Sequence, residues 1–193
     1  MSDWMRDQLD THVNTATGMT ALLPTVRRVG EALCRAYAAD HRLYTFGNGG
    51  SAADAQHFSG EIIGHYKRDR RPLGAVTLST DPTVMTCIAN DYSYDDVFAR
   101  QVEALARPGD MVAGFTTSGS SPNVVSGLQR AKQNGATTVL FGGGDGGAAR
   151  EFADYSLIVP SQITARIQEM HTLMLHLISE LVDSWAAGEG ERE

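Results

Sequence analysis

The stretch LYTFGNGGSAADAQHFSGE, residues 43–61, holds the pattern that decides the fold. A short apolar run leads into a glycine-rich turn, and a longer amphipathic segment follows. Glycines in such a turn let the backbone approach a ligand, and the first turn of the following helix offers unpaired N–H groups to an anion. The turn lacks the Walker lysine and the spacing of a dinucleotide fingerprint, which disfavours nucleotide binding. An ordinary strand-to-helix turn is an equal alternative.

Similar apolar runs recur along the chain and alternate with longer amphipathic stretches. Intervening segments of this length are typical of crossover helices, which join parallel strands with a right-handed connection. The sequence therefore predicts an α/β fold, a three-layer α/β/α sandwich in which a five-stranded parallel sheet is covered on both faces. The expected strands are LYTF at 43–46, GAVTL at 74–78, MVAGF at 111–115, TTVLF at 137–141 and YSLIV at 155–159.

Two of the expected crossover helices carry a start signal. Asp81 stands directly before Pro82, and Ser121 directly before Pro122. A capping side chain followed by proline at the first helical position is typical of a helix N-terminus. We therefore expect Asp81 and Ser121 to cap these helices.

Both ends of the chain are expected to be helical. Residues 1–40 place apolar residues at three- and four-residue spacing with a break near Thr17-Gly18, which predicts a helical pair that can bundle with another subunit. Residues 161–187 carry a long apolar stripe and predict a buried or interfacial helix. These segments belong to one expected domain over 1–193, with an α/β core at 41–160 and a polar tail at 188–193.

The composition limits the classes of partner. The chain has 193 residues, of which 42% are hydrophobic and 20% charged, so extended disorder is not expected. A formal net charge of -7 gives no basic footprint for nucleic acid or an anionic membrane. The two cysteines, Cys34 and Cys87, indicate neither a disulfide framework nor a metal ribbon. No apolar run approaches a membrane span, and we expect a soluble cytoplasmic protein.

A second loop, TTSGSSP at 116–122, also lies between an expected strand and an expected helix. Its hydroxyl groups are compact donors without fixed charge, which suits a phosphate monoester. A simple capping loop is an equal alternative. Two such loops after two strands of one parallel sheet favour a ligand crevice at the strand C-termini. The third glycine-rich stretch, GGGDGG at 142–147, lacks hydroxyl donors, and we interpret it as a flexible connection.

Titratable side chains are spaced for metal or acid–base chemistry on two expected helices. His57 and Glu61 stand four residues apart, which puts both on one face, where they can share a divalent ion. A surface hydrogen bond is the commoner reason for such a pair. On the C-terminal helix, periodicity pairs Glu169 with His176, whereas Gln168 lies about 80° from His176 around the axis. Helical geometry alone does not select between Gln168 and Glu169, and bonds across a subunit interface are an equal alternative.

Taken together, four segments resemble the sedoheptulose 7-phosphate isomerases, also called phosphoheptose isomerases, of the sugar isomerase (SIS) domain superfamily. The resemblance implies an SIS-type, flavodoxin-like fold and a homotetramer assembled through helical bundles. It also implies conversion of D-sedoheptulose 7-phosphate to D-glycero-D-manno-heptose 7-phosphate through an enediol, the first step of bacterial heptose biosynthesis for surface glycans such as lipopolysaccharide. The segments are GNGGSAADAQHFSGE at 47–61, ANDYSYDDVFAR at 89–100, TTSGSSPNV at 116–124 and TARIQEMHTLMLH at 164–176.

The resemblance also implies roles for individual residues. One zinc ion per subunit is expected, with His57, Glu61, Gln168 and His176 as ligands, so that Gln168 rather than Glu169 enters the site. Glu61 is the expected catalytic base, and His176 relays a proton on the other side of the substrate. The partner is a small sugar phosphate. Its expected contacts are Asn48, Gly49, Gly50, Ser51, Glu61, Asn90, Asp91, Thr116, Thr117, Ser118, Ser121 and Gln168.

Two positions depart from the family pattern. Ala165 stands where the family often has an acid, and His65 stands where it has a basic residue. Neither change removes an expected ligand. Two alternatives remain. The protein could be a non-catalytic tetrameric SIS protein that binds a replication initiator, or it could isomerise another phosphosugar.

Overall fold

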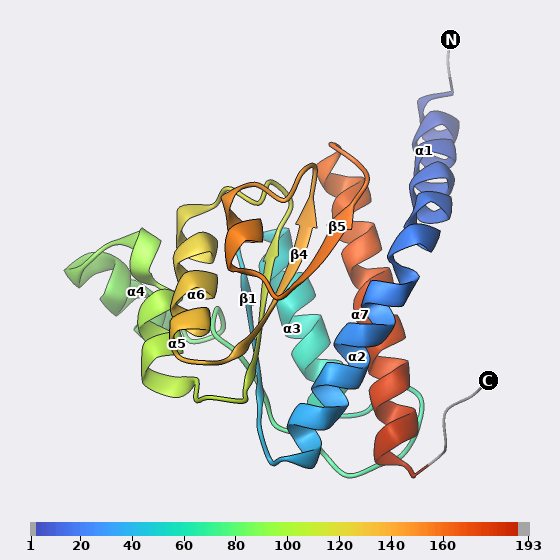
Figure 1. Ribbon diagram of the computed structural model, residues 1–193. Coiled ribbons are helices and arrows are strands. Elements are labelled where there is room, and N and C mark those ends of the chain that lie inside the picture. Colours follow the sequence, from blue (N-terminus) through green and yellow to red (C-terminus); the bar gives the residue numbers. More distant parts are fainter. Residues whose placement is uncertain (1–2, 189–193) are drawn as a thin grey trace.

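The computed structural model describes residues 3–188, which fold as alternating strands and helices (Figure 1). The predicted tail at 188–193 lies outside the described residues except for Gly188. The elements are α1 (Trp4–Gly18), a 3-10 turn (Met19–Leu22), α2 (Leu23–Ala38), β1 (Leu43–Gly47), α3 (Gly50–Ile63), β2 (Ala75–Thr77), α4 (Pro82–Asp91), a 3-10 turn (Tyr94–Asp96), α5 (Ala99–Leu105), β3 (Met111–Thr116), α6 (Pro122–Gln133), β4 (Thr137–Gly143), a 3-10 turn (Ala148–Phe152), β5 (Tyr155–Val159) and α7 (Thr164–Ala186).

The five strands form one sheet in the order β2-β1-β3-β4-β5, and every neighbouring pair is parallel. All five occupy the predicted positions, so the predicted five-stranded parallel sheet is confirmed. Alternate side chains of a strand point to opposite faces. In β3, for example, Met111 and Ala113 belong to one apolar core, and Val112 belongs to the other. The sheet is therefore buried on both sides.

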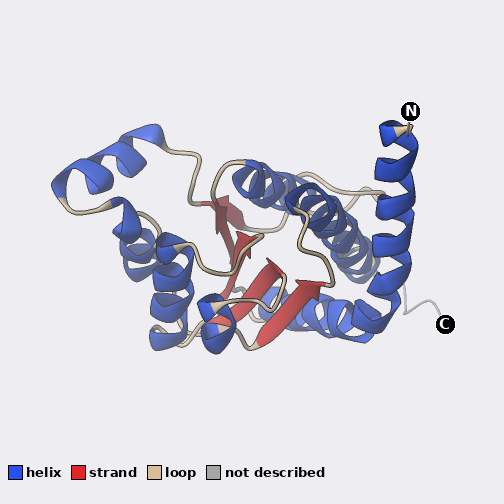
Figure 2. Cartoon of the chain, turned by 90° about the horizontal axis from the view of Figure 1, so that it is seen from above, coloured by secondary structure: helices blue, strands red, loops and turns tan. Residues whose placement is uncertain are grey.

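Helices cover the sheet in two layers, as predicted. Figure 2 shows the strands between two groups of helices. The core on one face is built with α2, α3 and α7, and the core on the other with α5 and α6. Within the first layer, α3 lies against both β1 and α7. This arrangement brings a helix from the first third of the chain next to the last one.

The N-terminal helical pair is interrupted at the predicted break, where a 3-10 turn separates α1 from α2. Helix α1 extends beyond the body of the molecule (Figure 1). It is tied to α7 because His12 Nδ1 lies 2.7 Å from Glu169 Oε2 and Arg166 donates to the carbonyl of Gln8. Its apolar side chains Trp4, Met5, Leu9 and Val13 are exposed. Among residues 3–188, no helix is long and apolar enough to cross a membrane.

Two local predictions need correction. Asp81 caps α4 by accepting the N–H groups of Thr83 and Val84, but Ser121 makes no side-chain cap bond at the start of α6. Its hydroxyl instead lies 3.4 Å from the hydroxyl of Thr116.

The second correction concerns the stretch 142–147, which is closely packed rather than a loose connection. Gly119 has a φ of 68°, and a Cβ built on it would lie 2.0 Å from the carbonyl oxygen of Gly146. The N–H of Ala149 also donates to the carbonyl of Gly119, at 2.9 Å. The third glycine-rich stretch therefore supports the loop that follows β3.

This packing predicts a large effect of Gly119→Ala. The new methyl group would meet backbone atoms at a positive φ, and we expect a loss of at least about 2 kcal/mol in the free energy of unfolding. Gly60→Ala is the matched control, because a Cβ at this exposed position of α3 meets nothing within 4 Å. Alanine there should stabilise the helix by roughly 0.5–1 kcal/mol. Urea unfolding of both variants measures the difference, and equal stabilities would contradict the close packing.

Candidate functional site

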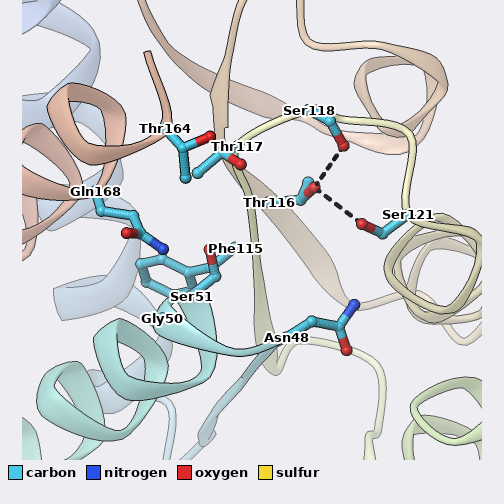
Figure 3. A pocket seen from close by; sticks show the side chains of 10 residues that line it. All are labelled: Asn48, Gly50, Ser51, Phe115, Thr116, Thr117, Ser118, Ser121, Thr164 and Gln168. Carbon is cyan, nitrogen blue, oxygen red and sulfur yellow. Dashed lines mark hydrogen bonds between the residues drawn. The ribbon is translucent and has the colours of Figure 1, made fainter. Parts of the chain in front are cut away.

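A polar pocket lies at the carboxyl ends of β1 and β3. These strands are neighbours, so the loops that follow them meet at one edge of the sheet. Strand β1 sits where the chain turns from β2 on one side to β3 on the other, the switch point at which parallel sheets bind ligands. The pocket has a volume of about 280 Å³. Its lining residues are Asn48, Gly50, Ser51, Phe115, Thr116, Thr117, Ser118, Ser121, Thr164 and Gln168 (Figure 3).

Hydroxyl groups of the second loop converge on this pocket. The hydroxyl of Thr116 lies 3.5 Å from that of Ser118 and 3.4 Å from that of Ser121, as the dashed lines in Figure 3 show. Helices α3 and α6 both begin at the pocket, and neither is capped by a side chain. Their dipoles therefore direct positive potential toward the pocket. Hydroxyl donors and helix N-termini together suit a phosphate group.

Asn48 is held at the pocket wall by a second amide. Its Nδ2 donates to Asn123 Oδ1 at 2.8 Å, and Asn123 Nδ2 donates back to Asn48 Oδ1 at 2.9 Å. The hydroxyl of Tyr94 donates to the same Asn48 oxygen, at 3.1 Å. The sequence interpretation missed Asn123, although a polar residue in the first turn of the helix after the hydroxyl loop was an available signal. This buried residue links the two loops.

Three candidate metal ligands meet where α3 and α7 lie side by side. His57 Nε2 is 2.9 Å from Glu61 Oε1 and 3.2 Å from His176 Nε2. Ligand atoms of the three residues all lie within 4.8 Å of one another. Burial lowers the pKa of His176, and the neighbouring His57 lowers it further, which favours the neutral imidazole that binds metals.

The spacing of these atoms fits a zinc ion. Two ligand atoms of a tetrahedral zinc ion, with bonds of roughly 2.0–2.1 Å, lie about 3.3 Å apart. The distances from His57 to Glu61 and to His176 are close to this value. Imidazole and carboxylate are also ligand types that zinc accepts. The pair predicted at i and i+4 therefore has a third partner from a distant part of the chain.

Gln168 and Glu169 point in different directions. The amide of Gln168 packs over Gly50 and lines the pocket. Glu169 instead contacts His12 and Arg166 beside α1, away from the pocket. The structure therefore places Gln168, and not Glu169, on the side of the pocket. Along α7 it stands two turns, or about 12 Å of helical rise, before His176.

Not every expected contact lines the pocket. Asn90 and Asp91 are exposed at the end of α4, where Asn90 Nδ2 donates to Asp91 Oδ1. Gly49 is the residue before α3, with a φ of 55°, and is absent from the lining of the pocket. Contacts of these three residues with a ligand stay predictions. Conversely, Thr164 lines the pocket from the start of α7 and was not singled out from the sequence.

Comparison with known proteins identifies the family. Residues 15–143 match the family model of the SIS domain. A phosphoheptose isomerase of Geobacter sp. (strain M21) is 45% identical over 184 residues, which cover 95% of this chain and 96% of that protein. The chain belongs to the phosphoheptose isomerase family of SIS domain proteins. The resemblance read from the sequence is thereby confirmed.

Two further family members extend the comparison. A probable phosphoheptose isomerase of Thermoplasma acidophilum is 49% identical over 155 residues, 80% of this chain and 85% of that protein. The solved structure of a phosphoheptose isomerase from Neisseria gonorrhoeae matches with a TM-score of 0.89 at 35% identity, covering 94% of this chain and 98% of that one. The family's fold therefore extends over nearly the whole chain.

Between the pocket and the candidate metal cluster lies a buried titratable pair. His171 Nδ1 is 3.9 Å from Asp54 Oδ2, and neither atom has a hydrogen-bond partner. Burial lowers the pKa of His171 to about 4 and raises the pKa of Asp54 to about 6. The other imidazole nitrogen, Nε2, lies 3.2 Å from the carbonyl oxygen of Gly142. Burial thus disfavours the charged form of both side chains.

The pair predicts how stability changes on acidification. Unfolded histidine binds a proton between about pH 6.5 and pH 4 that folded His171 does not, so His171 destabilises the fold as the pH falls. Asp54 acts in the opposite direction, because its folded pKa is raised. Asp54→Asn removes this compensation. Since Asp54 is only partly buried, the free energy of unfolding of the variant should fall by up to about 2 kcal/mol more than that of the wild type between about pH 7 and pH 4. Urea unfolding of both proteins in chelator tests this, and parallel pH curves would contradict it.

Proposed function

We propose that the protein isomerises D-sedoheptulose 7-phosphate to D-glycero-D-manno-heptose 7-phosphate, the first step of bacterial heptose biosynthesis. The observation that carries the proposal is the placement of two sites along one pair of parallel helices. The phosphate-type pocket lies at Gly50 and Gln168, and the His/Glu/His cluster lies further along both helices. Seven residues separate Gly50 from His57, or about 10 Å of helical rise. A seven-carbon sugar with a terminal phosphate can span this separation.

The reaction moves a proton between neighbouring carbons through an enediol. The pocket would hold the phosphate through the hydroxyls of the second loop and the N-termini of α3 and α6, so that the reacting end has one orientation. Glu61 would remove the proton from C1 and deliver it to C2, and His176 would move a proton at the carbonyl oxygen. A bound zinc ion supplies Lewis acidity for the developing oxyanion.

We further propose one zinc ion per subunit, held by His57, Glu61 and His176, with Gln168 as the fourth ligand. The convergence of the three ligand atoms, with His57 2.9 Å from Glu61 and 3.2 Å from His176, supports the first three. The family resemblance implies Gln168, and the contacts of Glu169 with His12 and Arg166, away from the pocket, support this choice. Asn90 and Asp91 are kept as substrate contacts, because Tyr94 links this segment to Asn48.

The proposal includes a homotetramer in the cytoplasm. The exposed apolar residues of α1 would be covered by the helices of other subunits, which accords with the bundle expected from the sequence. Cytoplasmic location suits a chain with an exposed free thiol, at Cys87, and an intracellular class of substrate.

Glu61→Gln tests the assigned base. The amide keeps the shape of the side chain but cannot accept the proton, so turnover of sedoheptulose 7-phosphate should fall by at least about a hundredfold with the fold intact. Glu103→Gln is the control, because Glu103 is an exposed partner of Arg130 and lies outside the site. Product is detected as the aldose phosphate, in zinc and after chelation, and circular dichroism checks the fold. Full activity of the Glu61 variant would exclude it as the base.

The wild-type assay tests the function itself. Purified protein is assayed with a panel of phosphosugars. Formation of D-glycero-D-manno-heptose 7-phosphate from sedoheptulose 7-phosphate supports the proposal, whereas turnover of a different phosphosugar alone would make that sugar the substrate. No turnover of any phosphosugar in any divalent metal would reject an isomerase function.

Neighbouring substitutions on α7 separate the two candidate ligands. Gln168→Ala should weaken zinc binding because it removes the proposed fourth ligand, and it should lower turnover because it also removes a side chain that lines the pocket. Glu169→Ala should leave both unchanged and instead loosen α1, since its contacts are His12 and Arg166. Zinc titration, steady-state kinetics and protease sensitivity of α1 measure the three effects. The opposite pattern would make Glu169 the functional residue.

A further inference from the structure

A buried ion pair anchors the segment that follows α3. Arg70 Nε donates to Asp183 Oδ1 at 2.9 Å, and both side chains are fully buried. The other carboxylate oxygen of Asp183 accepts three successive backbone N–H groups, those of Tyr66, Lys67 and Arg68, at 3.0, 2.6 and 3.0 Å. Burial raises the pKa of Asp183, but the backbone donors and Arg70 outweigh it and hold the pKa below its usual value. The segment is therefore fixed to α7 by a charged group.

The guanidinium of Arg70 also binds the end of α3. Its Nη2 donates to the carbonyl of Glu61 at 2.9 Å, and its Nη1 donates to the carbonyl of Ile62 at 2.8 Å. The last carbonyls of a helix have no partner within the helix. Arg70 therefore satisfies two of them and fixes the backbone of the residue that carries the candidate base.

Tyr66 connects this anchored segment to the metal cluster. Its ring stacks on the imidazole of His176 with centroids 5.0 Å apart and an interplanar angle of 15°. His57 approaches the same imidazole at 79°, edge to face. The ammonium of Lys67 lies 5.0 Å from the Tyr66 ring and pairs with Glu180 at 2.8 Å. The imidazole of His176 is thus held between two rings, with Tyr66 stacked on it and His57 at a steep angle to it.

We propose that the Arg70–Asp183 pair is a positioning element for the catalytic cluster, acting through Tyr66 on His176 and through the end of α3 on Glu61. The inference rests on the proposed isomerase function for its kinetic part, but not for its metal-binding part. Burying a charged pair is a weak source of stability compared with apolar packing. Here the pair fixes both the segment that carries Tyr66 and the end of α3 that carries Glu61. Groups that orient a metal ligand contribute to its affinity without touching the metal.

Tyr66 variants give the most direct test. Tyr66→Leu removes the aromatic face but leaves an apolar side chain, and it should lower zinc affinity and kcat by roughly 10–100-fold each. KM should change little, because the hydroxyl loop is untouched. Tyr66→Phe keeps the stacked ring and should restore both quantities. Competition with a chromogenic chelator measures zinc affinity, and steady-state assays separate kcat from KM.

Arg70→Lys tests the ion pair itself. Lysine keeps the charge but cannot bind Asp183 and the carbonyls of α3 together, so zinc affinity and kcat should fall in the same direction as in Tyr66→Leu. Asp110→Asn is the control for a general loss of stability when a buried polar contact is weakened away from the cluster. Asp110 accepts the N–H groups of Arg42 and Arg107 at 2.9 and 2.7 Å, at the start of β3 and away from the cluster. This variant should lose stability while keeping wild-type zinc affinity and kcat.

The outcomes are distinct. Wild-type zinc affinity and kcat in Tyr66→Leu would overturn the inference, whether or not Arg70→Lys folds. Equal losses in Arg70→Lys and Asp110→Asn would show a general effect of stability and would also overturn it. A wild-type protein that binds zinc but turns over no phosphosugar would reject the proposed function, and the zinc titrations would still decide the positioning role.

Discussion

The site depends on the close parallel packing of α3 against α7. At Gly50, where a Cβ would lie 2.3 Å from the amide nitrogen of Gln168, glycine leaves room for this side chain between the two helices. Further along, Thr172 donates to Asp54, and His57 meets His176. Each contact joins residues more than a hundred positions apart in the chain. The packing of the two helices on one face of the sheet therefore assembles the pocket and the candidate metal cluster together.

The pocket is suited to an anion without using a cationic side chain among its lining residues. The whole chain carries a formal charge of -7, and the lining consists of hydroxyls, amides, glycine, phenylalanine and helix N-termini. Such donors recognise a phosphate through directed hydrogen bonds and fixed dipoles. The acidic surface then does not oppose binding strongly, because the donors lie at short range and the surface charges are screened by salt.

Much of this architecture could be predicted from the sequence. The five strands are short apolar runs bounded by turns, and His57 and Glu61 follow from helical periodicity. Other features depend on contacts between distant segments that local patterns do not encode. Ser121 has the pattern of a cap but faces Thr116, and the stretch 142–147 is held by its contact with Gly119. Likewise the pairing of Asn48 with Asn123 and the stacking of Tyr66 on His176 required the folded chain. The choice between Gln168 and Glu169 came from family resemblance and not from the helix.

Because α3 and α7 run in the same direction, their electric fields add. Both amino ends are near the pocket and give it positive potential, whereas His57 and His176 lie beyond the first turns of these helices, where this potential has fallen off. An elongated ligand with an anionic group at one end therefore meets a more positive potential at the pocket than at the cluster. The two orientations in which such a ligand can enter therefore differ in electrostatic energy, even before the ligand contacts a side chain of the cluster. The shared direction of the two helices, which follows from the topology of the fold, therefore favours one binding orientation of the ligand.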